Sequence, residues 1–458
     1  MRILIVGGGH VGLYAARRLA RKIHRGEAEI IMVDPQPHMT YQPFLPEAAA
    51  GSISPRHAVV PLRRELRGKA TVLAGTVSRV EHARKVAIVE PIIGPSREVA
   101  YDHIILVPGS ISRTLPIPGL REEAVGFKTV GEAIYLRNKV LEQIDVAATT
   151  TDPATRRRAL TFVFIGGGYA GIEAMAEMED MATAALHYYP ELKHSDMHWI
   201  LVEATQRILP EVTRDLGAYA VEEMRKRNMD IRLSTRMESC EGGLVKLSDG
   251  DQYRADTIVW TAGVKAHPML EHTDLPRDSR GRLRCTPTLQ VTSGDQLGGS
   301  GVVEGAWSAG DCAAVPDMTA ADPATTMCAP SAQHAVRQAR TLADNIVAVI
   351  RGQVPTMYKH KYVGSVASLG LYKGVAWVYG VKVRGFPAWF MHRTYHLSRI
   401  PSVNRKIRVT LDWTQSLILR REVVSLGELH TPRGQFESAA EPFTKVPEPV
   451  NLDTRIRG

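Results

Sequence analysis

The chain has 458 residues and a formal net charge of +9, and 44% of its residues are hydrophobic. That length predicts a globular protein of about two or three domains with a sizeable core, which excludes a peptide or a fibre. No uncharged run of about 18 apolar residues is present, so we expect no transmembrane helix. The start, MRILIVGGG, has no charged n-region or cleavage site, so we expect no signal peptide. The positive net charge alone is compatible with a nucleic-acid partner, with an anionic membrane partner or with neither.

The first glycine turn follows directly on a predicted strand. Residues 3–12, ILIVGGGHVG, contain Gly7-x-Gly9-x-x-Gly12, and LYAARRLARK continues with helical periodicity. The first glycine permits a tight turn, the second lets the backbone approach a pyrophosphate, and the third allows close helix packing. The next strand, IIMVD, ends in Asp34, whose carboxylate can accept from a ribose 2′-OH. These residues predict a dinucleotide site.

The same unit recurs in the middle of the chain. FVFIGGGYAGIEAMAEMEDM contains Gly166-x-Gly168-x-x-Gly171, and the later strand WILVE ends in Glu203. One glycine pattern is weak evidence, but two of them, each with its strand, helix and acid, are specific. Because both units end in an acid, we expect NADH in preference to NADPH, although Arg207 keeps NADPH open.

Three further stretches are typical of a protein with two nucleotide units. YDHIILVPGS and ADTIVWTAGV each predict a strand that ends in a glycine turn, at Gly109 and Gly263. In GAWSAGDCAAVP, small residues around Gly310 let Asp311 approach a cofactor. We therefore favour a ribityl or pyrophosphate contact for Asp311 over an ordinary turn.

The cysteines provide neither a redox pair nor a metal site. They are widely spaced, with no CxxC and no cysteine–histidine cluster at metal spacing. We expect buried, reduced, structural thiols, so dithiol chemistry is disfavoured. The four are Cys240, Cys285, Cys312 and Cys328.

These motifs, in this order, resemble the two-dinucleotide flavoproteins. Over nearly the whole chain the resemblance is to type II, non-proton-pumping NADH:quinone oxidoreductases, and it includes YQPFLPEAAAG (residues 41–51), VEATQRILP (residues 202–210) and SAQHAVRQA (residues 331–339). It implies an α/β fold with two Rossmann-like dinucleotide-binding domains, the second inserted into the first. The first would hold FAD and the second NAD(H).

The resemblance also implies which residues serve each cofactor. It places Glu173 beside the nicotinamide and flavin, as a polar or proton-handling group. The FAD contacts that it implies are Gly7, Gly9, Gly12, Asp34, Gln42, Val77, Gly109, Asp311, Ala332 and Gln333. The NAD(H) contacts that it implies are Gly166, Gly168, Gly171, Glu173, Glu203 and Gly263.

The stretch SAQHAVRQA resembles the family's AQxAxQQG motif at the flavin and quinone site. Gln333 and Arg337 are four residues apart and share a helix face, where an amide and a guanidinium can hydrogen-bond a quinone carbonyl. The resemblance implies a place at the quinone end for Gln338 as well. Arg337 stands where the family has a glutamine, and Ala339 where it has a glycine. Lys373 resembles a lysine near the quinone in some members, where an ammonium can donate a proton.

The expected domain organisation follows from the order of the motifs. The FAD-binding domain comprises residues 1–115 and 263–345, on either side of an NAD(H)-binding domain at 116–262. Residues 346–430 are expected to form a C-terminal α/β interface and membrane-binding region. The polar, proline-rich residues 431–458 are expected to form a tail without chemistry.

Residues 384–421 carry eight Lys and Arg residues interleaved with aromatic ones. FPAWFMHRTYHLSRI and NRKIRVTLDWTQSLI would form two amphipathic segments suited to an anionic lipid interface. We therefore expect a peripheral enzyme at the cytoplasmic side of a membrane, with menaquinone or ubiquinone as its acceptor. A solvated basic face or a homodimer surface is the alternative. No nucleic-acid-binding motif accompanies the charge, so nucleic acid is not expected as a partner.

Other functions of the same fold stay open from the sequence. A ferredoxin reductase-like enzyme would reduce a protein partner, docked on the basic C-terminal face. A sulfide:quinone oxidoreductase would need cysteines at the flavin, which the wide cysteine spacing disfavours. A nucleotide-sensing flavoprotein would bind both cofactors with little turnover.

Overall fold

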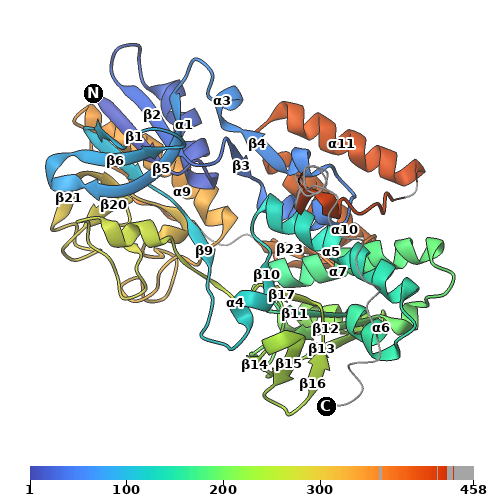
Figure 1. Ribbon diagram of the computed structural model, residues 1–458. Helices are drawn as coiled ribbons and strands as arrows, with labels where there is room; N and C mark the ends of the chain where they lie inside the picture. The colour runs from blue at the N-terminus through green and yellow to red at the C-terminus, as the bar shows by residue number, and fades with distance from the viewer. Residues whose placement is uncertain (361–363, 420, 431–436, 438–458) are drawn as a thin grey trace.

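Two α/β units and a C-terminal region make up the chain in the computed structural model (Figure 1). The structure describes residues 1–360, 364–419, 421–430 and 437. Apart from residue 437, the tail predicted for residues 431–458 lies outside the described residues.

The first unit is built on an eight-stranded sheet of order β20-β21-β8-β1-β2-β5-β6-β7. Its five central strands, from β21 to β5, are parallel, and β1 is buried beyond its first residue. Helices α1 (His10–Lys22) and α9 (Ala332–Ile350) pack against each other beside this sheet. The strands are β1 (Arg2–Val6), β2 (Glu29–Asp34), β5 (Thr71–Glu81), β6 (Val86–Pro91), β7 (Arg97–Ala100), β8 (His103–Leu106), β20 (Gln290–Thr292) and β21 (Val302–Trp307).

The second unit has a parallel sheet of order β10-β17-β11-β12-β13. A small antiparallel sheet, β14-β15-β16, follows it in the chain. The strands are β10 (Ala124–Gly126), β11 (Thr161–Ile165), β12 (His198–Val202), β13 (Met229–Arg232), β14 (Met237–Ser239), β15 (Leu244–Leu247), β16 (Gln252–Arg254) and β17 (Thr257–Trp260). The main helices are α5 (Val130–Thr149), α6 (Pro153–Ala159), α7 (Tyr169–Ala185) and α8 (Arg214–Arg225).

Two short strands carry the chain into and out of the second unit. β9 (Ser110–Ser112) leaves the first unit, β18 (Val264–Ala266) returns to it, and the two pair antiparallel. The last two strands of the first sheet, β20 and β21, therefore come after all strands of the second sheet in the chain. This confirms the predicted fold class, in which the second Rossmann-like domain is inserted into the first.

The C-terminal region packs against both units. Strands β23 (Gly364–Ser368), β24 (Gly374–Val378) and β25 (Val381–Arg384) form an antiparallel sheet covered by α10 (Phe386–Arg399). Helix α11 (Val403–Ile418) follows and lies along the outside of the molecule (Figure 1). None of the helices in the described part of the chain is long and apolar enough to cross a membrane.

Two carboxylates attach α11 to the first unit. Asp412 accepts hydrogen bonds from the Ser54 amide, at 3.0 Å, and pairs with the His57 imidazole. On α2 (Leu45–Ala49), the buried Glu47 accepts from the Trp413 indole at 2.5 Å. These polar pairs act together with the buried Val409 and with Trp413, which packs on Phe44, to hold α11 against the first unit.

Asp412→Ala is expected to lower the free energy of unfolding by about 1–3 kcal/mol, because it leaves the Ser54 amide and His57 without their acceptor. Thermal or denaturant unfolding of the cofactor-loaded protein measures this change. Asp412→Asn keeps an acceptor oxygen and should lose less. An unchanged unfolding midpoint in Asp412→Ala would show that this carboxylate does not hold α11.

Candidate active site

The two glycine turns have the same geometry at the starts of α1 and α7. A Cβ atom at Gly12 would lie 1.9 Å from the Gly7 carbonyl oxygen, and one at Gly171 would lie 2.0 Å from that of Gly166. Gly7 itself has φ +103°, which disfavours any residue with a side chain. The strand and helix of each unit can therefore meet this closely only with glycine at these positions.

Each turn is closed by the acid at the end of the next strand. Asp34 Oδ2 accepts from the Gly8 amide at 2.6 Å, and Glu203 Oε2 accepts from the Gly167 amide at 2.6 Å. The second oxygens accept from the amides of Gln36 and Thr205, at 2.7 Å each. Burial raises the pKa of the Asp34 carboxyl, although the hydrogen bonds from the Gly8 and Gln36 amides act against the shift. The acids predicted to meet the ribose thus also fix the shape of the turns.

The first turn fits FAD. In the described chain, no atom lies within 4 Å of a Cβ built at Gly9 or at Gly109, so backbone and ligand can approach there. The His10 Nε2 atom is buried without a hydrogen-bond partner among the described residues. Burial lowers the pKa of His10 to about 4, so its imidazole is neutral at neutral pH. A neutral, unpartnered imidazole at the start of α1 suits a polar ligand group rather than a second apolar surface.

Asp311 lies in a short polar chain beside this turn. The Ser110 hydroxyl donates to Asp311 Oδ2 at 2.7 Å and accepts from the Lys128 ammonium at 2.6 Å. Burial lowers the pKa of Lys128 despite the neighbouring carboxylates. The predicted FAD contact Gln42 donates to the Lys128 carbonyl at 3.4 Å. Lys128 was not predicted from the sequence, because it lies in a linker without a glycine or acid pattern.

Helix α9 begins at Ala332, after the residues Pro330 and Ser331 that suit a helix start. Ser331 caps it by accepting from the His334 amide at 3.1 Å, and Ala332 is its exposed first residue. Gln338 is buried, and its amide oxygen accepts from the Gly310 amide at 2.7 Å. Gln338 therefore anchors α9 to the turn that presents Asp311.

Gln333 and Arg337 lie together on α9, away from Gln338. The Gln333 amide donates to the Gly364 carbonyl at 3.0 Å, and the Arg337 guanidinium donates to the Gln333 carbonyl at 3.2 Å. Lys373 lies in the turn between β23 and β24 and is half-buried. No hydrogen bond or ion pair joins its ammonium to the other predicted residues within the described chain.

Glu173 is buried at the beginning of the second turn of α7. Its Oε1 atom accepts from the Ser368 amide at 2.9 Å and lies 3.0 Å from His392 Nε2. Burial lowers the pKa of His392, but the Glu173 carboxylate outweighs it and leaves the pKa raised. The predicted proton-handling acid therefore has a buried base as its neighbour.

Residues 1–339 match the family model of the pyridine nucleotide-disulphide oxidoreductases. The chain belongs to this family. It is 27% identical to the type II NADH:quinone oxidoreductase Ndh of Mycobacterium tuberculosis, over 92% of this chain and 89% of that relative. It is 25% identical to the type II NADH:quinone oxidoreductase of Staphylococcus aureus, over 86% of this chain and 93% of that relative.

Solved structures show the same fold. NDH2 from Plasmodium falciparum, in complex with NADH, has a TM-score of 0.82 to this chain. The match covers 92% of this chain and 99% of that chain, at 16% sequence identity. At that identity the likeness concerns the arrangement of the domains and not the chemistry of their side chains.

In this pyridine nucleotide-disulphide oxidoreductase the remaining predicted contacts lie along the two sheets. Val77 is buried in β5, opposite Val89 on β6, and Gly263 follows β17 with φ +93°. All four cysteines are buried, and burial raises the pKa of each thiol, so none is poised as a thiolate. The cofactor contacts assigned to Gln42, Val77 and Gly263 stay predictions.

Two histidines of α10 were missed by the sequence reasoning. His392 is buried and His396 is partly buried, with ring centroids 4.6 Å apart, and the Tyr41 hydroxyl donates to the His396 carbonyl at 3.2 Å. Their spacing of four residues on a helix rich in apolar residues is a signal that could have found them. The basic and aromatic residues of the segment predicted an exposed, lipid-facing surface instead.

Gly9→Ala and Gly168→Ala are each expected to weaken the binding of one cofactor and not of the other. Both glycines have φ values that alanine adopts, and neither Cβ would meet a described atom within 4 Å. A methyl group there obstructs a pyrophosphate, so we expect FAD affinity to fall about tenfold or more in Gly9→Ala and the KM for NADH to rise about tenfold or more in Gly168→Ala. Flavin content after gel filtration and steady-state kinetics measure the two effects. Loss of FAD in both variants would contradict separate sites.

Proposed function

We propose that the chain is a type II NADH:quinone oxidoreductase, which passes two electrons from NADH through FAD to a membrane quinone without pumping protons. The observation that carries this proposal is the pair of closed glycine turns, each with its own acid, in one chain with a capped polar helix beside the Asp311 turn. The names and nearly full coverage of the relatives support it.

The chain's own residues divide the work between the two ends of the site. FAD, when bound, supplies the two-electron carrier. Asp34 and Glu203 hold the two turns, and a carboxylate at the second turn favours NADH, because it can accept from a ribose 2′-hydroxyl. Glu173, beside Ser368 and His392, is placed to hold a proton in a buried setting.

The quinone end is assigned to Gln333, Arg337 and Lys373. Gln333 and Arg337 are joined through the Gln333 carbonyl, so the guanidinium is held on the face that the amide occupies. The remaining guanidinium N–H groups of Arg337 can donate to a quinone carbonyl oxygen. An arginine in place of the family's glutamine adds a fixed positive charge there, which stabilises a developing quinol anion. Menaquinone and ubiquinone both present the carbonyl pair that this arrangement requires.

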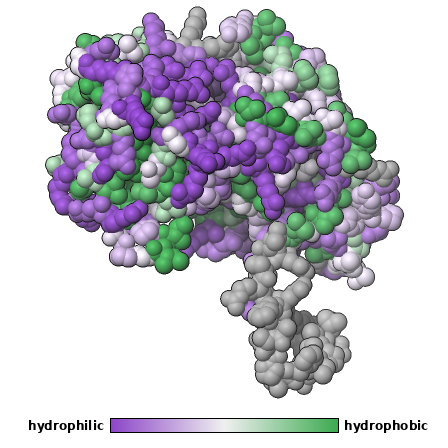
Figure 2. All heavy atoms as spheres, turned by 90° about the horizontal axis from the view of Figure 1, so that it is seen from above, coloured by the Kyte–Doolittle hydropathy of each residue, from purple (hydrophilic) through white to green (hydrophobic). Residues whose placement is uncertain are grey.

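The surface of α11 supports association with a membrane. Its apolar side chains at Val403, Ile407, Leu411 and Ile418 are exposed at helical spacing, and only Val409 is buried. Figure 2, a view from above Figure 1, shows patches of hydrophobic spheres among hydrophilic ones on the side where α11 lies. Apolar residues flanked by Arg and Lys suit a helix that lies in an anionic interface, which we propose to be the cytoplasmic face of a membrane.

Two basic residues of this region face the interior instead. Arg393 is buried, lies 3.3 Å from Glu47 and stacks on Trp389 at 4.2 Å. Arg421 lies 3.7 Å from Glu177. These two arginines attach the C-terminal region to the body of the molecule, so the charge available to lipid is smaller than the sequence count.

Anaerobic titration with NADH is expected to bleach the flavin of the purified protein, and a menaquinone or ubiquinone analogue is expected to restore its colour. The first step tests the nicotinamide and FAD sites, and the second tests the acceptor. Bleaching that no quinone analogue reverses would remove the quinone assignment and favour a protein acceptor or a sensing role.

Leu411→Glu combined with Ile418→Glu is expected to reduce co-sedimentation with anionic vesicles by about tenfold, because two carboxylates replace apolar contacts at a negative surface. Ile93→Glu is the matched control, since Ile93 is 90% exposed in the turn after β6, on the first unit. The control should bind vesicles like the unmodified protein. Equal loss in both, or no binding by the unmodified protein, would contradict a role for α11.

A further inference from the structure

Three acids lie along one face of α7, leading away from the nucleotide turn. Glu173, Glu177 and Asp180 are spaced by four and three residues, so their side chains neighbour one another on the helix. They span about 10 Å along the helix axis, at about 1.5 Å per residue. Glu173 lies near the turn that binds the nicotinamide nucleotide in the proposed function, and Asp180 lies in the helix's second half.

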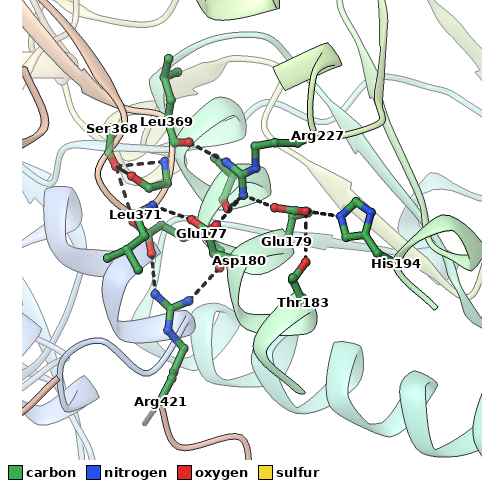
Figure 3. A network of polar contacts seen from close by, with 12 residues as sticks. Glu177, Glu179, Asp180, Thr183, His194, Arg227, Ser368, Leu369, Leu371 and Arg421 are labelled. Carbon is green, nitrogen blue, oxygen red and sulfur yellow. Dashed lines mark hydrogen bonds and ion pairs between the residues drawn. The ribbon is translucent and has the colours of Figure 1, made fainter. Parts of the chain in front are cut away.

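Glu177, the middle acid, is completely buried. Its Oε2 atom has no hydrogen-bond partner among the described residues, but it forms an ion pair with the Arg421 guanidinium at 3.7 Å. Its Oε1 atom accepts from the Ser368 hydroxyl at 3.5 Å (Figure 3). Ser368 also donates its amide to Glu173, so one residue contacts both carboxylates. A buried carboxylate with an oxygen that accepts no hydrogen bond costs free energy, so burial favours the protonated, neutral form of this group.

A cavity of about 420 Å³ lies at the far end of this face. It is lined by Asp180 and Arg421 together with Ser52, Ala184, His187, Tyr188, Leu371, Ser416 and Leu419. Tyr188 and Leu419 are more than half exposed, so the cavity reaches the molecular surface. Asp180 and Arg421 each lie next to Glu177 in Figure 3, and Arg421 also donates to the Ser52 hydroxyl at 3.1 Å. Water in the cavity can therefore come close to the middle acid.

The proposed reaction requires one proton from solvent in each turnover. NADH releases two electrons and one proton, whereas a quinone takes up two electrons and two protons to become the quinol. The second proton therefore comes from solvent, and buried acids near the proposed nicotinamide site are candidates to deliver it.

We propose that this proton enters through the cavity and is relayed by Glu177 to Glu173, a route that rests on the proposed function. Glu177 takes the proton at its Oε2 atom from water beside Arg421 and Asp180. It passes the proton on to Glu173, one helical turn away on the same face of α7, and Glu173 receives it next to His392. Glu177 is thus a positioning residue for proton delivery and does not touch the reacting atoms.

The charges around Glu177 suit this role at neutral pH. Burial raises the pKa of Glu177 to about 7, Asp180 on the same helix and Glu47 on α2 add to the rise, and Arg421 and Arg393 of the C-terminal region oppose it. A carboxyl group with this pKa both gains and loses a proton readily near pH 7. Below pH 7 it carries the proton, and above pH 7 it does not, so proton delivery should slow as pH rises.

Glu179 is a matched control on the same helix. It is buried like Glu177, but it accepts from the Thr183 hydroxyl at 3.1 Å, lies 2.7 Å from His194 Nε2 and pairs with Arg227 (Figure 3). No hydrogen bond within the described chain connects it to Ser368 or Glu173. Glu179→Gln therefore removes an equally buried charge without interrupting the route.

The test follows quinone-dependent reoxidation of the NADH-reduced holoenzyme by stopped flow from pH 5.5 to 9. The unmodified enzyme should show a rate that falls above an inflection near pH 7. Glu177→Gln should lose this inflection and be slower by about tenfold or more at pH 6, because an amide cannot relay a proton. Glu179→Gln should keep the inflection. Arg421→Gln, which removes a charge that lowers the pKa of Glu177, should move the inflection to higher pH.

Flavin content and the unfolding midpoint confirm that each variant is folded before its rate is interpreted. An inflection that persists unchanged in Glu177→Gln overturns the route, as does its loss in Glu179→Gln to the same extent. An unmodified enzyme that no quinone reoxidises would overturn the proposed function instead, so the two failures are distinguishable.

Discussion

Three buried carboxylates hold the C-terminal region against the two nucleotide-binding units. Glu47 pairs with Arg393, Glu173 with His392, and Glu177 with Arg421. Each acid comes from one of the two units, and each base comes from the segment that follows them. Removing either member leaves an uncompensated buried charge, which costs about 3–5 kcal/mol. Because such pairs stabilise only when both members stay in place, they fix where the C-terminal region sits more than they add to overall stability.

This constraint determines what the C-terminal segment can do. The bases that face inward cannot serve a lipid surface, while the apolar side chains of α11 that face outward have no partner in the described chain. Helix α10 therefore places His392 and Arg393 on its buried side, whereas α11 exposes its apolar side chains, which is why we propose α11 as the membrane-facing element. The two neighbouring helices differ in burial because α10 packs on the β23–β24 sheet and α11 makes fewer contacts with the body of the molecule.

The two nucleotide units close their glycine turns with the same hydrogen bond. In both, the acid after the second strand accepts from the middle glycine amide of the turn, at the same distance of 2.6 Å. The difference lies in their surroundings: α9 and the Asp311 turn complete the first site, whereas β23 and α10 approach the second at Glu173. The antiparallel pair of β9 and β18 joins the two units where the chain passes between them.

The glycine turns, their acids, the Asp311 turn and the start of α9 could be predicted from the sequence alone. Each depends on contacts among residues within about 35 positions, where steric limits on the backbone leave few arrangements. The insertion of one domain into the other was implied by the family that these motifs resemble. The residue types at Gln333 and Glu173 indicated chemistry because a known family places the same types there.

Only the tertiary structure decided which charged groups are buried together. Nothing in the local pattern around Glu47, Glu177, His392 or Arg393 shows that they meet, since their partners are between about 190 and 350 residues away in the chain. Composition marked Arg393 and Arg421 as surface charge, and folding turned both inward. Sequence determines local backbone geometry through sterics, but the burial of a charge depends on which distant segment supplies its counter-charge, and that is settled only when the whole chain packs.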